Sequence, residues 1–113
     1  MRRGDFVTVA FQGDFGKPRP AIVIQAIVIQ ADAFGEHSTV TVLPVTSTRL
    51  DAPLLRVPVH PTPENGLRTP SQVMIDKAVT VNRNKVEAPF GRIDGDTMIE
   101  IERRVAVFLG IVK

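Results

Sequence analysis

The sequence predicts an α+β domain in which a small, curled antiparallel β-sheet or barrel is followed by one C-terminal helix. Segments rich in β-branched residues, with apolar and polar side chains in alternation, fill the first two thirds of the chain. Glycine and proline separate these segments, and the last twenty residues change to a helical period. Strands grouped ahead of one helix, rather than alternating with helices, are the order of an α+β domain.

The size and composition fit one globular domain, which we expect to span residues 1–113. Hydrophobic residues make up 43% of the chain, enough for a core. No apolar run approaches the ~18 residues that cross a membrane, so a cytoplasmic protein is expected. Cysteine is absent, and the two histidines, His37 and His60, are isolated in the sequence. We therefore expect no disulfide, no metal ion and no cofactor.

Five segments have the composition of β-strands. They are Asp5–Phe11, Ala21–Gln25, Thr39–Ser47, Leu54–His60 and Ser71–Asn82, the last of which is one strand or two. Proline cannot donate a hydrogen bond to a ladder, so Pro44 is expected at a bulge or bend and Pro58 on an edge strand. A short turn with helical tendency is expected in the stretch NRNKV that follows Val81.

The C-terminal segment DGDTMIEIERRVAVFLGIVK has the pattern of one amphipathic helix. Its apolar residues recur at spacings of three or four and form a single stripe, made of Met98, Ile101, Val105, Phe108, Leu109 and Val112. Asp94 or Asp96 can cap the first turn.

The sequence AIVIQ occurs twice in succession, at residues 21–25 and 26–30. An insertion of five residues, an odd number, sends every later side chain of a strand to the opposite face. The direct attachment of Arg19 and Pro20 to the first copy favours Ala21–Gln25 as the core strand, with Ala26–Gln30 extending it or entering the next loop. A bulge near Gln25 is expected if the isoleucines of both copies are buried on one side.

The opposite assignment stays open, because the two copies have the same composition and burial energy barely distinguishes them. If the second copy takes the core position, Arg19 is displaced by up to about 17 Å of extended chain. A site that needs Arg19 at the entry of the core strand then cannot form unless the first copy loops out.

Arg19, Thr46 and Asp76 are the candidate catalytic residues. Arg19 stands between two prolines at a strand entrance, Thr46 and Ser47 end another strand, and Asp76 and Lys77 lie in an otherwise apolar segment. An arginine can neutralise a phosphate, a hydroxyl can hydrogen-bond to it, and a carboxylate can take a proton. Each group also has an ordinary structural explanation, as a surface charge, a turn at a strand end or an ion-paired aspartate. The pattern alone does not decide between these readings.

Several segments, taken together and in order, resemble the MazF/PemK-like toxins of bacterial type II toxin–antitoxin pairs. The resemblance covers nearly the whole chain and is carried by MRRGDFVTVAF, GKPRPAIVIQ, VTVLPVTS, SQVMIDKAVTV and VAVFLGIVK. The combination of RGD near the start, RPAIVIQ and LPVTS is specific, whereas any one of these motifs alone is weak.

The resemblance implies an SH3-like barrel of the CcdB/PemK type with a C-terminal helix, and a homodimer. It implies an endoribonuclease that cleaves single-stranded RNA at short sequences without a metal ion. The substrate's own 2′-hydroxyl attacks the adjacent phosphate and leaves a 2′,3′-cyclic phosphate and a 5′-hydroxyl. A cognate antitoxin with an acidic tail is the implied protein partner.

Residue by residue, Arg19 matches the arginine before proline in the family's strand-entry motif, and Thr46 matches the threonine of its strand-end motif. Asp76 falls where the Kid/PemK branch carries a catalytic carboxylate. That branch has an arginine two residues earlier, where this chain has Met74, and an arginine often follows where this chain has Val79. The general acid is therefore not assigned by the resemblance.

Substrate contacts are expected from the polar residues next to these three, namely Lys17, Ser47 and Lys77.

Two other functions remain in view. The gyrase-poisoning CcdB-like toxins share the fold but depend on a C-terminal tryptophan motif, and this chain ends FLGIVK and contains no tryptophan. A binding domain without catalysis is the other alternative, suggested by the repeat and by Met74.

Overall fold

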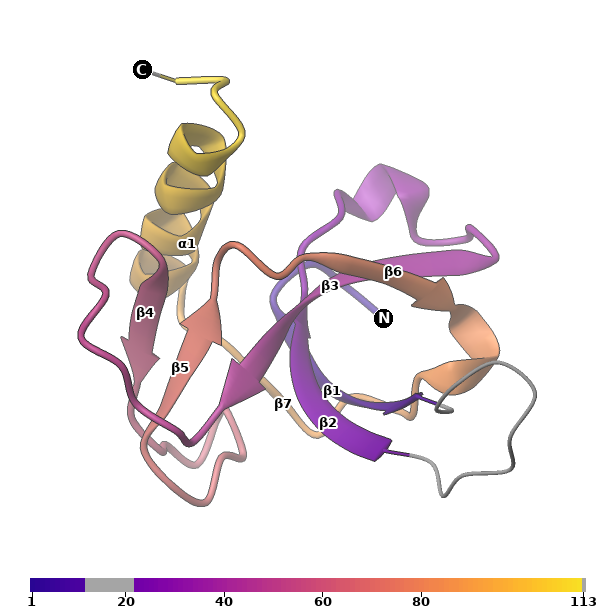
Figure 1. Cartoon of the computed structure of the whole chain (residues 1–113). Coiled ribbons are helices and arrows are strands. Elements are labelled where there is room, and N and C mark those ends of the chain that lie inside the picture. The colour runs from indigo at the N-terminus through magenta and orange to yellow at the C-terminus, as the bar shows by residue number, and fades with distance from the viewer. Residues whose placement is uncertain (12–21, 113) are drawn as a thin grey trace.

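The computed structural model describes residues 1–11 and 22–112 and consists of a curled antiparallel sheet with one C-terminal helix (Figure 1). This confirms the predicted α+β class. In sheet order the strands run β4-β5-β3-β2-β1-β7, and β6 also pairs with β3. The elements are β1 (Asp5–Phe11), β2 (Ile22–Val28), β3 (Thr39–Thr46), β4 (Arg56–Val59), β5 (Ser71–Met74), β6 (Val79–Asn82), β7 (Gly91–Arg92) and α1 (Gly95–Phe108), with 3₁₀ turns η1 (Asp32–Phe34) and η2 (Arg83–Lys85).

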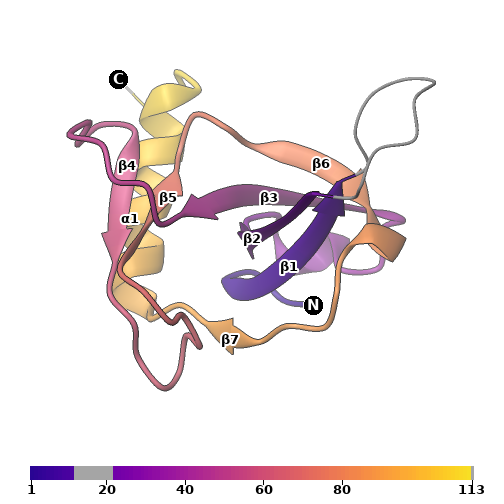
Figure 2. The same ribbon diagram turned by 60° about the horizontal axis from the view of Figure 1, so that its bottom comes forward.

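Strands β1, β2, β3 and β6 curl into a small barrel. Strand β6 pairs with the first half of β3, and the chain then returns through η2 to the free side of β1. There Glu87 N donates to Thr8 O at 2.9 Å and Phe90 N donates to Phe6 O at 2.9 Å. Figure 2 shows β6 and the segment around β7 on opposite sides of the three central strands. These contacts cover both edges of the β1–β3 sheet, as a barrel requires.

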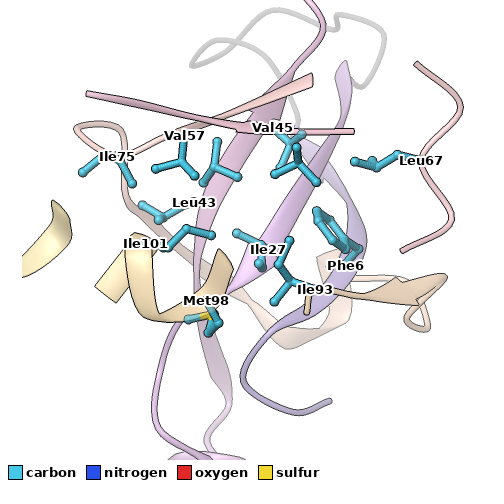
Figure 3. Packing of buried hydrophobic residues seen from close by; sticks show 12 residues of the cluster. Phe6, Ile27, Leu43, Val45, Val57, Leu67, Ile75, Ile93, Met98 and Ile101 are labelled. Atoms are coloured by element: carbon cyan, nitrogen blue, oxygen red, sulfur yellow. The ribbon is translucent and has the colours of Figure 1, made fainter. Parts of the chain in front are cut away.

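The central strands bury side chains on both faces, and this gives the protein two cores. The barrel core consists of Val7, Val9, Ala26, Val28, Val40 and Val42. The helix-side core lies between the other face, the β4–β5 hairpin and α1, and consists of Phe6, Ile27, Leu43, Val45, Val57, Val59, Leu67, Val73, Ile75, Ile93, Met98 and Ile101. Figure 3 shows Ile27 near the middle of the helix-side core. Alternate residues of one strand therefore enter different cores, which explains their almost continuous apolar sequence.

Helix α1 begins where the sequence predicted. Asp94 is its N-cap: the carboxylate Oδ2 accepts from Thr97 N and from Thr97 Oγ1, both at 2.9 Å. Met98 and Ile101 are buried in the helix-side core, and Val105 contacts it. The C-terminal part of the expected apolar stripe does not pack into the helix-side core: Phe108, Leu109 and Val112 are exposed.

Both AIVIQ copies contribute to β2, and the expectation that the first copy is the core strand was wrong. The register with β1 is unbroken from Phe6 opposite Ile27 to Phe11 opposite Ile22, so no bulge separates the copies. Val28 of the second copy is only 2% exposed, whereas its counterpart Val23 is 61% exposed.

Position in the sheet explains the difference between the copies. Ala26 and Ile27 of the second copy pair with β1 on one side and with β3 on the other. Val23 and Ile24 of the first copy pair with β1 alone. Ile24 of the first copy contacts the barrel core, whereas Ile27 and Ile29 of the second copy belong to or contact the helix-side core, so these isoleucines point to opposite faces. The parity expected for an odd repeat in a strand without a bulge is therefore observed.

Of the two predictions for prolines within strands, the one for Pro58 is confirmed and the bulge expected at Pro44 is absent. Pro58 lies on β4, which ends the sheet, as expected. Pro44 is opposite Ala26 in an unbroken register, so it does not form a bulge there. It falls between the part of β3 that pairs with β6 and the part that pairs with β5, where the missing N–H interrupts neither ladder.

The remaining boundaries follow the sequence with two differences, at β4 and β7. Ser71–Asn82 forms two strands, one of the two expected arrangements, and the segment NRNKV contains the expected helical turn η2. The strand expected at Leu54–His60 is shortened to Arg56–Val59, and β7, only two residues long, was not predicted.

Candidate functional site

Thr46 and Ser47 lie at the C-terminal end of β3, as predicted. Thr46 is the last residue of the strand and stands opposite Gln72 of β5. Its Oγ1 accepts a hydrogen bond from Thr48 N at 3.1 Å, which turns the chain sharply after the strand. Ser47 is exposed. The Thr46 hydroxyl still has its own proton to donate, so it can bind an oxygen atom of a ligand at this turn.

The turn after Thr46 is held by two residues that the sequence analysis did not select, Gln72 and Arg56. The side-chain oxygen of Gln72 accepts from Leu50 N and from Arg56 Nη1, each at 3.1 Å. Its Nε2 donates to Leu50 O at 3.1 Å. Arg56 Nη1 also donates to Thr48 O at 3.2 Å. Gln72 is only 9% exposed, so these bonds are shielded and hold the backbone from Thr48 to Leu50 in place.

A sequence signal for Gln72 existed, although it was not recognised. The segment SQVMI is otherwise apolar apart from its first residue, and a buried amide in such a strand needs several hydrogen-bond partners. Arg56 had a weaker signal, as a single charge within LLRVPVH, a segment that was expected to be an edge strand.

Asp76 and Lys77 follow the end of β5 and form an ion pair, with Lys77 Nζ 2.7 Å from Asp76 Oδ2. The hydrogen bond from Lys77 is the main cause that lowers the pKa of Asp76 below its usual 3.8, and the charge of Arg56 acts in the same direction. The carboxylate is therefore ionised at neutral pH. In this state it can accept a hydrogen bond or a proton, but it has no proton to give.

The predicted site residues are brought together only in part. Thr46 stands opposite Gln72 near the start of β5, whereas Asp76 follows the end of the same strand. Arg56 bridges this separation: it bonds to the turn after Thr46, and its charge affects Asp76. Arg19 and Lys17 lie outside the described residues, so their positions relative to Thr46 stay predictions.

A pocket of about 240 Å³ opens beside Arg56 and Gln72. Arg104 of α1 also lines it and is fixed there by Glu100, whose Oε1 lies 2.6 Å from Arg104 Nε, and by the carbonyl of Pro53. Two guanidinium groups and an amide thus surround a space large enough for a small anion or part of a nucleotide. Asp51 also lines the pocket and adds one negative charge.

Within residues 1–11 and 22–112, no group of three or more histidine, cysteine, aspartate or glutamate side chains is placed to hold a metal ion. None of the helices in this same part of the chain is long and apolar enough to cross a membrane.

Replacement of Gln72 by leucine is expected to destabilise the turn after Thr46. The variant loses three hydrogen bonds and leaves the backbone groups of Leu50 without their partner, at a cost of about 1–3 kcal/mol in the free energy of unfolding. Urea denaturation measures this change. Thr80→Val is the control, because it removes only an exposed hydroxyl contact between Thr41 and Thr80 and should change stability by less than about 0.5 kcal/mol. Equal stability of the two variants would show that Gln72 does not hold the turn.

Known proteins match this chain over almost its whole length. Residues 2–109 match the family described as PemK-like, MazF-like toxin of type II toxin-antitoxin system. A relative from Mycolicibacterium smegmatis (strain ATCC 700084 / mc(2)155), named probable endoribonuclease MazF, is 46% identical over 112 residues, which are 98% of this chain and 98% of the relative.

Solved structures of low sequence identity have the same fold. An endoribonuclease in complex with its cognate antitoxin from a mycobacterial species superposes with a TM-score of 0.76 at 20% identity and covers 100% of this chain and 98% of its own. A MazE–MazF structure (Form-III) from Deinococcus radiodurans gives 0.75 at 19% identity, with coverage of 97% and 96%. The family match spans all strands and the helix, so the chain belongs to the PemK-like, MazF-like toxins of type II toxin–antitoxin systems.

Proposed function

We propose that this protein is an endoribonuclease toxin that cleaves single-stranded RNA at specific short sequences without a metal ion. The observation that carries the proposal is the 46% identity, over almost the whole chain, to a relative named probable endoribonuclease. The turn at Thr46 supports it, because the Thr46 hydroxyl binds Thr48 N and the Arg56 guanidinium holds the same turn through Thr48 O.

The proposed reaction is an attack of the substrate's 2′-hydroxyl on the adjacent phosphorus atom. The new bond closes a 2′,3′-cyclic phosphate, and the bond to the 5′-oxygen breaks to release a 5′-hydroxyl. In this scheme Arg19 binds the phosphate and stabilises its growing negative charge, and Thr46 donates a hydrogen bond to a phosphate oxygen. Lys17, Ser47 and Lys77 bind the RNA.

Asp76 is proposed to accept the proton of the attacking hydroxyl. The lowered pKa agrees with an acceptor that is always ionised, but it also makes this carboxylate a weak base. The departing 5′-oxygen must receive its proton from another group. Arg56 adds a positive charge between the Thr46 turn and Asp76, which favours a phosphate in this region.

The proposed partners are RNA, a cognate antitoxin and a second copy of the chain, all in the cytoplasm. An apolar surface supports the homodimer: Leu54, Val107, Phe108, Leu109 and Ile111 are each at least half exposed. Leu54, Val107 and Phe108 line a hollow of about 470 Å³ between the β3–β4 connection and α1. Exposed apolar residues grouped in this way favour association with another protein surface.

Incubation of the purified protein with long single-stranded RNA in excess EDTA tests the proposed function. We expect a limited set of fragments, each ending in a 2′,3′-cyclic phosphate, whose yield does not depend on the chelator. Intact RNA together with a trapped DNA gyrase complex would favour the gyrase-poison function instead. Intact RNA with RNA or antitoxin still bound would favour a binding domain without catalysis.

A further inference from the structure

The pocket of about 240 Å³ beside Arg56 opens on the same face of the sheet as Thr46. Side chains directly opposite one another on paired strands share a face, and successive side chains of one strand alternate between faces. One row across β3, β5 and β4 enters the helix-side core and consists of Val45, Val73 and Val57. The next row, Thr46, Gln72 and Pro58, therefore points to the other face. Gln72 and Pro58 line the pocket, which thus begins about one strand spacing, roughly 5 Å, from Thr46.

The lining of this pocket combines apolar walls with charged groups of both signs. Arg56 and Arg104 supply hydrogen-bond donors, and the carboxylate of Asp51 is an acceptor. The apolar members of the lining are Leu50, Ala52, Pro53 and Pro58. A phosphate would gain nothing from apolar walls and would be repelled by Asp51. An apolar space with a few polar groups of both kinds instead suits a flat organic ring such as a nucleobase.

The two arginines are held in place before any ligand arrives. Arg56 Nη1 donates to Thr48 O at 3.2 Å and to Gln72 Oε1 at 3.1 Å. Arg104 Nε lies 2.6 Å from Glu100 Oε1. In the part of the chain that the structure describes, the hydrogen bonds of Arg56 use Nη1 alone, which leaves Nε and Nη2 to bind a ligand as a fork. A side chain that is already held loses little conformational freedom when the ligand binds.

We propose that this pocket binds a guanine base of the RNA substrate, an inference that rests on the proposed function. Guanine presents the adjacent acceptors O6 and N7, the pair that an arginine fork binds, and Arg56 supplies that fork. Its next edge presents N1–H and the 2-amino group, two adjacent donors that the carboxylate of Asp51 can accept. Adenine has a donor beside N7, and the pyrimidines have no N7, so guanine alone matches both the arginine and the carboxylate.

The location of the pocket identifies which part of the substrate it contacts. Thr46 is proposed to bind an oxygen of the scissile phosphate, and Gln72 of the pocket stands directly opposite Thr46. A base in the pocket therefore belongs to a nucleotide next to the cleaved bond, and its phosphate lies within the field of Arg56. Single-stranded RNA exposes its base edges to contacts of this kind. The pocket would then fix one position of the short sequence at which the RNA is cut.

Binding of mononucleotides tests the pocket without cleavage. We expect guanosine monophosphate to bind on the order of 10-fold more tightly than adenosine monophosphate, and to shift the amide resonances of Leu50, Asp51 and the Gln72 side chain in a nuclear magnetic resonance titration. Inosine monophosphate lacks only the 2-amino group and should bind more weakly than guanosine monophosphate. Since the three nucleotides share the same phosphate, any difference between them comes from the base.

Asp51→Ala is the variant that connects the 2-amino group to its acceptor. Asp51 is exposed, so the variant should stay folded, and it should bind guanosine and inosine monophosphates with equal affinity. Glu36→Ala is the matched control, because Glu36 is an exposed carboxylate ahead of β3, at the other end of that strand from Thr46. The control should keep the preference for guanosine monophosphate.

Three outcomes of the titration would overturn the proposal. They are equal affinity for the guanosine and adenosine nucleotides, resonance shifts that avoid the pocket, and an undiminished preference for guanosine over inosine monophosphate in Asp51→Ala. The first of these would indicate a site for the phosphate alone. None of the measurements involves RNA cleavage, so the guanine site fails or stands separately from the proposed function.

Cleavage of a random-sequence single-stranded RNA then tests the consequence for specificity. Sequencing of the fragment ends should show guanine at one fixed position next to the cut, and Asp51→Ala should relax the preference at that position only. A defined substrate with 7-deazaguanosine at that position lacks the N7 acceptor and should be cleaved on the order of 10-fold more slowly. Cleavage without a guanine preference near the cut would contradict the role of the pocket in specificity. Guanine binding without any cleavage would contradict the proposed function and leave the guanine site supported.

Discussion

Replacement of Arg19 by alanine is expected to reduce RNA cleavage by on the order of 10²-fold or more, the usual effect of removing a group that stabilises charge in the transition state. Arg19→Lys should recover little of the loss, because the guanidinium binds two phosphate oxygens in one plane and an ammonium group acts as a single point charge. The measurement is the rate of cleavage of a defined single-stranded RNA at saturating and at low substrate concentration.

Arg68→Ala provides the control for Arg19→Ala. Arg68 is exposed in the connection before β5 and carries the same charge, so its removal tests whether loss of one positive charge alone weakens cleavage. Both variants should keep the circular dichroism spectrum of the unaltered protein. Equal cleavage by Arg19→Ala and the unaltered protein would remove Arg19 from the site and leave Arg56 as the better candidate for the phosphate.

Replacement of Phe6 by alanine is expected to lower the free energy of unfolding by about 3–5 kcal/mol, the range for a large aromatic side chain removed from a core. Phe6 has no exposed surface, and the centre of its ring lies 5.9 Å from that of Phe90. The space it leaves cannot close easily, because the backbone of β1 is paired to β2 on one side and to the segment before β7 on the other.

The control for Phe6→Ala is Phe34→Ala in η1, which removes the same side chain from an exposed position. Its effect should stay within about 0.5 kcal/mol, as for most surface substitutions. Chemical denaturation with urea compares the two variants. A similar destabilisation by both would mean that Phe6 is not a central part of the helix-side core.

The strands and helix could be predicted because each has a local signal. Asp5–Phe11 was located exactly, and the cap at Asp94 followed from an acidic residue ahead of a helical stripe. Burial was harder to predict than secondary structure. The two AIVIQ copies are identical in sequence, so only the neighbours supplied by the rest of the sheet distinguish Val23 from Val28, and those neighbours are far away along the chain.

The candidate site was predictable where a motif marks it and not elsewhere. Thr46 ends a strand recognisable from its β-branched residues, and the structure places it there. Gln72 and Arg56 could not be selected, because their importance comes from hydrogen bonds to a turn more than ten residues from Gln72 and from the pairing of three strands. The separation of Thr46 from Asp76 could not be predicted either, because it depends on the register between β3 and β5. This register sets Thr46 opposite Gln72, near the start of β5, whereas Asp76 follows the end of β5.

The sharing of β1, β2 and β3 between two cores has a consequence for how the protein loses its structure. Neighbouring residues such as Phe6 and Val7 belong to different cores but to one backbone. Separation of α1 from the sheet would expose one face of the same strands that line the barrel, and disruption of the barrel would remove the surface on which α1 rests. We therefore expect no intermediate in which only the barrel core or only the helix-side core is folded. Thermal unfolding should be a single all-or-none transition, although the protein has two cores.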